Sequence, residues 1–520
     1  MRELAWLGVI LAVAAVLRFV ALPTRGQWDA DQGHDMLVLL AMTQSGELPL
    51  LGPPTSIGDV HHGALYYYLL APAAWLSGAD PVAVTAMIAI AGVAAVAVTW
   101  WLARSIGGAL AGLIAALLMA VSSSAVEEST FIWNPNLIPL ASSIALAGAW
   151  RAWSGEVARP LAWIVAFGGA IVTMHCHVLG SILAPAIVVP WILDVRRRPG
   201  AQRRRLLLAG VAGLLLLVVS YVPLLVHELS TDFAEARAAL AFVAGGGEAS
   251  ATPLPLRFLV IGLRVLAWPL VGLITEAPIA AIAAAAGVIG AIAWRWLAGS
   301  PAERTASRWF GLTLLWTTAA LSIAASGLAT VVPRLPNDHY HAFADPIVFV
   351  AVSLGIAAIA RLPGRAAEQA GGAWSRPGAV LAGMMVVAIA AFNLVRQPPF
   401  VSPDGGWPAG DAAGERVLAS LAGRPNSEPL VLESLPEFKS AEALRFPLVR
   451  RGADAHDGWS DSSSLDLFPQ VVLCDAIFEA AIGAACGGSA EDALVAPDGQ
   501  RLIDQFEAAP GRWVSVYVPE

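Results

Sequence analysis

The stretch Ala83-Val-Thr-Ala-Met-Ile-Ala-Ile-Ala-Gly-Val-Ala-Ala-Val-Ala-Val-Thr-Trp-Trp-Leu-Ala103 has no charged side chain. A helix needs about 20 consecutive apolar residues to cross the hydrocarbon core of a bilayer. A helix of this length on the surface of a soluble protein would carry a polar face as well. The stretch therefore predicts a transmembrane helix, and comparable runs decide the fold of residues 1–396.

The whole chain has the composition of a membrane protein. Of its 520 residues, 57% are hydrophobic and only 13% are charged, whereas a soluble domain carries about 25% charged residues. We therefore predict an all-α polytopic membrane protein with about eleven transmembrane helices. The predicted spans are 4–22, 83–103, 107–124, 135–150, 160–175, 177–193, 206–226, 277–297, 310–330, 343–360 and 378–396.

The orientation follows from the arginines, because short cytoplasmic loops are enriched in basic residues. The densest basic cluster lies between two spans, at 196–205. Counting spans from this loop places the N-terminus inside, and it places the loop 23–82 and the tail 397–520 outside. The count is consistent only if the stretch 257–275 does not cross, so we predict an external helix lying in the interface. The abundance of Ala, Gly and Arg favours a bacterial plasma (inner) membrane, and no basic tract suggests a nucleic-acid partner.

The tail 397–520 changes character and is rich in polar residues. Short β-like runs occur at 429–433, 470–474 and 513–518, as expected for strands. We predict a small α+β extracytoplasmic domain. An outward tail meets an oxidising compartment, which favours a disulfide between Cys474 and Cys486 over two buried free thiols.

The loop 23–82 is too long for a simple connector, and long loops tend to be functional. Asp29, Asp31 and Asp35 directly follow the first span. If this segment is helical, Asp31 and Asp35 share one face, with His34 beside them. Clustered carboxylates raise each other's pKa, which suits a general base. The alternative is a solvated acidic loop without a catalytic role.

Further along this loop, His61 and His62 precede Tyr66 and Tyr67. Their pattern indicates an amphipathic segment at the interface, with these four side chains as candidate substrate-binding residues. The tyrosines could instead form an aromatic belt at the membrane surface. The histidines could join the aspartates around a divalent metal, but nothing has the spacing of a zinc site, and we assign no metal ligand and no cofactor.

The order of these motifs resembles a known family. Asp31-Gln32 is followed about a dozen residues later by Gly46-Glu-Leu-Pro49, and then by His62-Gly-Ala-Leu-Tyr66. This order is similar to the first external loop of GT-C glycosyltransferases, a superfamily that includes the aminoarabinose transferases and the protein O-mannosyltransferases. The resemblance implies that Asp31 is the catalytic aspartate and that His62 contacts a lipid phosphate. Gln32 and His62 depart from the family pattern, which has Glu and Lys there.

The resemblance extends to two further external loops. It implies that Glu128, or its neighbour Glu127, orients the acceptor, although capping by Asn134 with Pro135 is a competing interpretation of that loop. In the loop 332–346 it implies that Arg334, His339 and Tyr340 meet the phosphate of the donor; the alternative for Arg334 is a cation snorkelling at the interface. His175 and His177, at the end of a span, are interpreted as a structural pair.

The residues and the resemblance together predict a membrane glycosyltransferase. It would move a sugar from a polyprenyl-phosphate donor to an extracytoplasmic acceptor hydroxyl on a glycan, a lipid or a protein. Residues 1–396 would form the catalytic domain. One alternative is a transporter or flippase for lipid-linked sugars, which would need ionisable residues deep within the spans. Another is a membrane-anchored binding protein that acts through residues 397–520.

Overall fold

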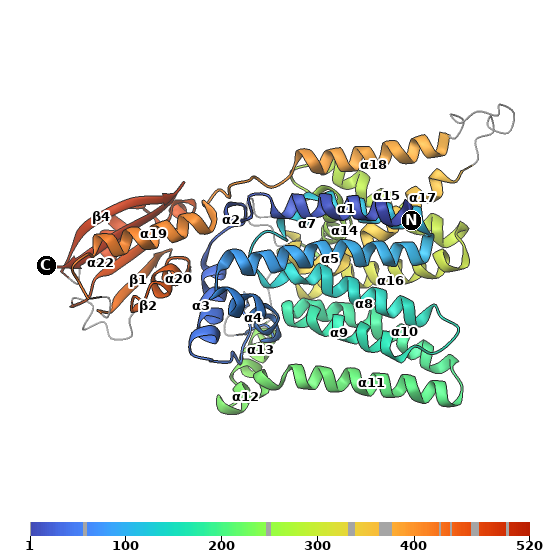
Figure 1. The fold of residues 1–520 in the computed structure, drawn as a ribbon, viewed down its shortest axis with the longest axis horizontal. Coiled ribbons are helices and arrows are strands. Elements are labelled where there is room, and N and C mark those ends of the chain that lie inside the picture. The colour runs from blue at the N-terminus through green and yellow to red at the C-terminus, as the bar shows by residue number, and fades with distance from the viewer. Residues whose placement is uncertain are drawn as a thin grey trace.

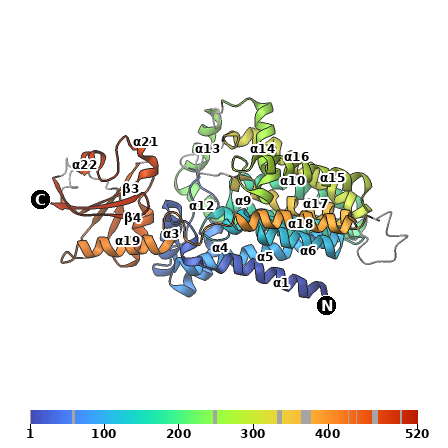
Figure 2. The same cartoon turned by 90° about the horizontal axis from the view of Figure 1, so that it is seen from above.

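The computed structural model describes residues 2–55, 60–245, 251–330, 338–362, 377–425, 428–436, 439–458, 467–495 and 499–520. Figure 1 shows a bundle of long helices with a smaller part at one end. This smaller part is built on a five-stranded sheet and carries the C-terminus. Figure 2 shows the same two parts from above, with short helices between them.

A helix occupies most of every predicted span. The long helices of the bundle are α1 (Arg2–Phe19), α5 (Pro81–Gly107), α6 (Ala109–Val121), α8 (Ile138–Trp153), α9 (Pro160–Cys176), α10 (Ala184–Arg197), α11 (Gly200–Ser220), α14 (Leu254–Val271), α15 (Pro278–Ala298), α16 (Pro301–Ala324), α17 (Asp345–Ala360) and α18 (Pro377–Val395). In the described part of the chain, six helical segments are long and apolar enough to cross a membrane, or seven if α11 and the following α12 (Val222–Ser230), bent by 45°, form one span. Shorter helices such as α6 and α9 are also apolar, so the count of about eleven stays a prediction.

The arginine-rich ends of the helices gather at one end of the bundle. Arg197, at the end of α10, donates to the carbonyl of Trp153 at the end of α8, and Arg361 donates to that of Gly107 at the end of α5. The sheet lies at the opposite end (Figure 1). This polarity is the one that the predicted orientation requires.

Helix α14 is one of the six segments that could cross, yet its contacts lie at the sheet-proximal end of the bundle. Ser122 donates to Pro269 O, and Asn393, near the end of α18, donates to Leu270 O. Arg264, in the middle of α14, bonds Leu328 O just after the end of α16. The C-terminal half of α14 therefore lies across the ends of other helices. This placement agrees with an interfacial helix, which stays a prediction.

Short helices fill the space between the bundle and the sheet. They are α2 (Leu22–Arg25), α3 (Ala30–Gln44), α4 (Leu65–Ser77), α7 (Ser123–Glu127), α13 (Ala234–Ala244), η1 (Asn134–Leu137), η2 (Val178–Leu183), η3 (Ser326–Ala329) and η4 (Asp338–Ala344). Gln32 explains where α3 begins, because its Oε1 accepts from the backbone N–H of Asp29 in the manner of a capping box. Its Nε2 donates to Ile132 O, a bond that the glutamate of the family pattern could not donate.

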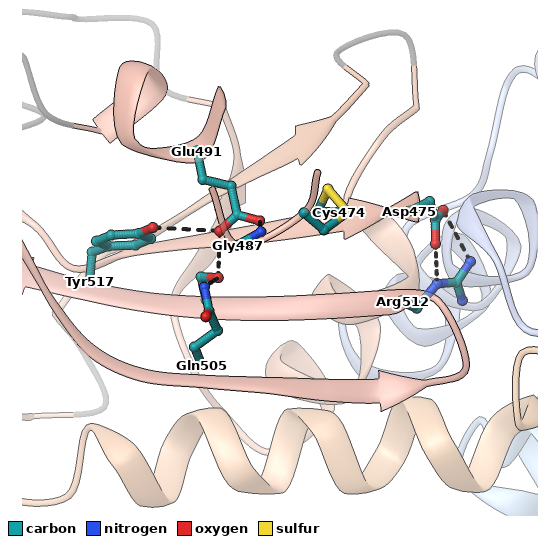
Figure 3. Close-up of a disulfide and its surroundings, with 9 residues drawn as sticks. Cys474, Asp475, Gly487, Glu491, Gln505, Arg512 and Tyr517 are labelled. Atoms are coloured by element: carbon teal, nitrogen blue, oxygen red, sulfur yellow. Dashed lines mark hydrogen bonds and ion pairs between the residues drawn. A yellow bond between two sulfur atoms is a disulfide. The ribbon is translucent and has the colours of Figure 1, made fainter. Parts of the chain in front are cut away.

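The C-terminal part contains all three of the strands expected from sequence. The strands are β1 (Leu430–Leu435), β2 (Ala455–Asp457), β3 (Gln470–Asp475), β4 (Gln500–Ala509) and β5 (Arg512–Pro519), in the order β2-β1-β3-β5-β4. Strand β1 pairs in parallel with β2 and β3, whereas β5 pairs antiparallel with β3 and β4. The helices of this part are α19 (Gly406–Ser420), α20 (Glu442–Arg450), α21 (Glu479–Ile482), α22 (Ser489–Val495) and the single turn η6 (Ala476–Phe478). Cys474 and Cys486 form the expected disulfide (Figure 3).

The sheet part is docked on α2 and α3. Trp28 packs against Trp407 edge-to-face and against Phe446 at a tilt, with ring centroids 4.6 Å and 5.7 Å away, and its indole N–H donates to Ala443 O. A Cβ at Gly33 would lie 2.1 Å from the carbonyl oxygen of Glu442, so only glycine lets α3 and α20 approach this closely. The C-terminal part is therefore packed directly against the helix that carries Asp31 and Asp35.

Candidate functional site

A cavity of about 540 Å³ lies where the bundle meets the short helices. It brings together six of the residues selected from sequence, which come from the two loops 23–82 and 332–346: Asp31, His34, Asp35, His62, His339 and Tyr340. Its wall also includes Trp133, His177 and Phe242, which we did not predict to be site residues. A volume of this size is typical of small-molecule sites.

Asp31 lies in the first turn of α3 and is the carboxylate that opens into the cavity. Its side chain is reached by solvent within the cavity, but protein surrounds it closely on all other sides. This partial desolvation, together with the charge of Asp29, raises the pKa of Asp31, against a hydrogen bond from Trp133 that lowers it. A carboxylate with a raised pKa and free access to a ligand has the properties of a general base.

Asp35 lies one turn further along α3, as the helical spacing predicted, but it is buried. Tyr66 donates to its Oδ2 and Tyr67 to its Oδ1, at 2.7 Å and 2.8 Å. Burial raises the pKa of Asp35 to about 7, although His34 and both tyrosines act in the opposite direction. Since both oxygens are already occupied, Asp35 supports the cavity wall rather than facing a ligand.

The two tyrosines therefore differ from the expectation. Tyr66 and Tyr67, selected as substrate-binding residues, are 0% and 1% exposed. They form neither a substrate surface nor an aromatic belt. Their hydroxyls hold a buried carboxylate, a role that a sequence pattern cannot distinguish from interfacial anchoring.

Asp35→Asn should flatten the dependence of stability on pH. The folded protein keeps a proton on Asp35 up to about pH 7, whereas the unfolded chain releases it near pH 3.9, about the usual value. The stability contributed by this proton is complete below about pH 4 and is lost as pH rises to 7. Between pH 5 and 7 we expect the parent to lose about 2 kcal/mol more than the variant.

Thermal unfolding of the purified protein in detergent, from pH 5 to 8, measures this difference. Asp232→Asn is the matched control, because Asp232 is exposed and is not among the residues that line the cavity. Parallel pH curves for the parent and Asp35→Asn would contradict the assignment.

His34 connects the cavity to the C-terminal part. Its Nδ1 lies 3.0 Å from Oε1 of Glu442, at the start of α20. Burial alone would lower the pKa of His34, but the hydrogen bond and the charge of Glu442 outweigh it and raise the pKa. His34 therefore stays positively charged to a higher pH than an ordinary histidine. Glu442, which belongs to the C-terminal part, is the cause.

Glu442→Gln should lower the pH above which His34 loses its positive charge. Removing the carboxylate leaves burial as the largest influence on His34, so the pKa of His34 should fall. If the charge of His34 helps to bind an anionic donor, the alkaline limb of the rate profile should shift to lower pH. Glu415→Gln, on the exposed face of α19, is the control, and an unchanged profile for Glu442→Gln would exclude this role of His34.

Three histidines with lowered basicity form the opposite wall. The ring of His177 lies 4.8 Å from that of His62 and 5.6 Å from that of His339. Burial, with the charge of His61, lowers the pKa of His62 to about 4, so His62 is neutral at pH 7. The backbone N–H of Val178 donates to its Nδ1, which leaves the proton on Nε2. His62 is therefore a neutral hydrogen-bond donor at pH 7, unlike the lysine that the family pattern has at this position.

His177 has the same arrangement, because its Nδ1 accepts from the N–H of Leu179. We interpreted it as one member of a structural pair, and the structure separates the two. His175 lies behind the wall, bonded to Ser220 and stacked on Tyr221, whereas His177 lines the cavity. One feature of the sequence could have indicated this difference. Residues two positions apart on a helix point to different sides, so only one of these two histidines could face the cavity.

Several other predicted residues lie away from the cavity. Asp29 forms ion pairs with Lys439 and Arg512, at 2.5 Å and 3.0 Å. Both cations also contact Asp475. Figure 3 shows the pair of Arg512 with Asp475, beside the disulfide at Cys474. Asp29, selected as a catalytic carboxylate, thus holds the sheet part against α3.

His61 and Glu128 are also outside the cavity lining. His61 pairs with Glu235 of α13 at 2.8 Å. Glu128 is buried beside Asp345 and Asp338, and burial, followed by the charge of Asp345, raises its pKa well above the usual range. Asn134 does not cap its turn but donates to Cys176 O. Arg334 lies outside the described residues.

The described residues contain one group of potential metal ligands within reach of a single ion: Cys474, Cys486 and Glu491. The disulfide uses both sulfur atoms, so this group does not fit a metal. Oε2 of Glu491 accepts from Ser515 instead, and its other oxygen accepts from Gly487 N (Figure 3).

Comparison with known proteins shows the fold. No protein-family model matches the sequence, and no curated protein matches it significantly. Among solved structures, the chain is similar to apo ArnT from Cupriavidus metallidurans, with 15% identity, a TM-score of 0.62, and coverage of 99% of this chain and 98% of ArnT. The same protein bound to undecaprenyl phosphate gives 14% identity, a TM-score of 0.63, and 98% coverage of both chains. ArnT is an aminoarabinose transferase of the GT-C class, so the resemblance seen in the motifs is confirmed at the level of the fold.

Proposed function

We propose that this chain is a membrane glycosyltransferase that uses a polyprenyl-phosphate sugar as donor and an extracytoplasmic hydroxyl as acceptor. The observation that carries the proposal is the position of Asp31. It is a carboxylate with a raised pKa, open to a cavity at the end of a GT-C bundle. The similar ArnT structure that contains undecaprenyl phosphate supports a donor of the same lipid class.

The cavity has parts suited to both reacting groups. The acceptor hydroxyl would approach Asp31, which takes its proton as the oxygen attacks the anomeric carbon of the sugar. The bond between that carbon and the phosphate oxygen then breaks, and the electron pair leaves with the lipid phosphate. Nε2–H donors of His62 and His177, and the positive charge of His34, would stabilise this leaving anion. Preorganised donors in a site shielded from water are an effective source of catalysis.

Arg334 is proposed as a further phosphate ligand. Its loop leads into η4, which places His339 and Tyr340 in the cavity wall. A guanidinium there would bind a phosphate through two parallel hydrogen bonds. Arg334→Lys tests the geometric part of this role, because lysine keeps the charge but not the fork.

The test of the function is transfer of radiolabel from a panel of polyprenyl-phosphate sugars by the purified chain in lipid vesicles. Sugars on a nucleoside diphosphate serve as the comparison donor. We expect transfer from at least one lipid-linked sugar and none from the nucleotide sugars. Movement of the labelled lipid across the bilayer without transfer to any acceptor would identify a flippase and overturn the proposal.

A further inference from the structure

A second, larger hollow lies on the side of the bundle, away from the cavity with Asp31. It has a volume of about 890 Å³ and runs between α10 and α16, with the end of α15 beside it. Val189 and Leu193 of α10 face it, as do Leu312 and Trp316 of α16. These four side chains are 44–59% exposed, with Val189 at 52% and Leu312 at 59%. An apolar surface of this kind, open to the outside of a membrane bundle, faces lipid.

The hollow has opposite chemistry at its two ends. Trp316 lies at the end nearer the Asp31 cavity, where its indole N–H donates to Ile182 O. Arg304 and Arg308 lie at the other end, in the first turns of α16. They are four residues apart and so project from the same face of the helix. By the predicted orientation, this basic end meets the cytoplasmic surface.

The two arginines are not neutralised by the protein. Both are exposed, and among the described residues no acidic side chain lines this hollow. The nearest carboxylates along the same helices are used elsewhere: Glu303 pairs with Arg295, and Asp194 pairs with Arg197. Arg308 also lies over the ring of Trp296, 5.6 Å from its centroid. Arg304 and Arg308 therefore place two positive charges at one end of an apolar groove.

The length of the groove indicates the kind of molecule that it binds. Arg304 and Trp316 are twelve residues apart on one helix, which corresponds to about 18 Å. Half of a bilayer core is about 15 Å thick, so the groove matches one acyl chain of one leaflet. We propose that this groove binds one anionic phospholipid of the cytoplasmic leaflet, with its phosphate between Arg304 and Arg308 and one acyl chain along α10 and α16.

Native mass spectrometry of the full chain tests this site, with phosphatidylglycerol and phosphatidylcholine of identical acyl chains as probes. We expect phosphatidylglycerol to be retained at least about tenfold more tightly, since each arginine near an anionic headgroup strengthens binding severalfold. Arg304→Gln with Arg308→Gln should remove this preference. The control is Arg203→Gln with Arg204→Gln, which makes the same charge change on exposed residues of α11, outside the groove.

A second variant keeps both arginines and fills the groove. Val189→Trp should weaken phosphatidylglycerol binding about as much as the double arginine variant, and it decides the question if that variant does not fold. Equal retention of the two lipids would overturn the proposal. So would an equal loss in the α11 control, which would indicate a diffuse surface charge effect. Displacement of the bound phospholipid by undecaprenyl phosphate would also overturn it, because the groove would then belong to the donor.

Discussion

Asp31→Asn should reduce sugar transfer by about 100- to 10,000-fold, the range that a positioned general base contributes. Asparagine has the shape of aspartate and still accepts a hydrogen bond from Trp133, but it cannot take a proton. The substitution therefore removes the base without changing the volume of the cavity. Donor binding should stay within a few-fold of the parent, because the phosphate is expected to contact the histidine wall instead.

The measurement is the initial rate of transfer at saturating donor, with the melting temperature of each variant as a check on folding. Asp232→Asn makes the same chemical change on an exposed carboxylate and should keep full activity. Asp31→Glu should recover part of the rate, since it restores a carboxylate at a shifted position. An Asp31→Asn rate near that of the parent would remove Asp31 from the mechanism and leave Asp35 as the only carboxylate of α3 in the cavity wall.

Arg264→Met should destabilise the protein by about 3–5 kcal/mol, as expected when one partner of a buried ion pair is removed. Arg264 and Asp338 are 0% and 1% exposed in their side chains. The guanidinium donates to both carboxylate oxygens, at 2.8 Å and 2.6 Å. Asp338 also accepts from His341, so the variant would leave a buried carboxylate with only one of these partners.

Unfolding in detergent by a chemical denaturant measures the loss. Arg257→Met on the same helix is the control and should cost less than about 1 kcal/mol, because Arg257 is only partly buried. Adding Asp338→Leu to Arg264→Met should recover part of the stability, since it removes the unpaired charge. A double variant less stable than Arg264→Met alone would show that Asp338 is held mainly by His341.

The same substitution should lower activity as well. Asp338 directly precedes His339 and Tyr340 on η4, and these two side chains line the cavity. The ion pair therefore ties α14 to the wall that we propose contacts the donor. Loss of transfer in a variant that remains folded at the assay temperature would separate this positioning effect from unfolding.

The resemblance of the motifs found three parts of the cavity wall, but it misplaced several roles. Asp31, His62 and the pair His339–Tyr340 line one cavity, as the motif order implied. Asp29 and Glu128 were selected because they are acidic residues in the correct loops. A loop position does not specify which way a side chain points. Asp29 pairs with Lys439 and Arg512, and Glu128 is buried beside Asp345 and Asp338.

Local sequence determined the features of this protein that depend on near neighbours. Apolar runs set the helices of the bundle, short runs rich in Val and Leu set β1, β3 and β5, and helical spacing put Asp31, His34 and Asp35 together on α3. Each of these follows from residues that lie near one another along one segment.

Only the tertiary structure decided which distant residues complete the site. Glu442 lies 408 positions from His34, which it bonds, and His177 reaches the cavity because α9 ends beside the first loop. Tyr66 and Tyr67 were chosen as ligands but hold Asp35, since burial and pairing depend on what the rest of the chain places around a side chain. Sequence periodicity specifies the face of an element, whereas the long-range packing of elements specifies what that face meets.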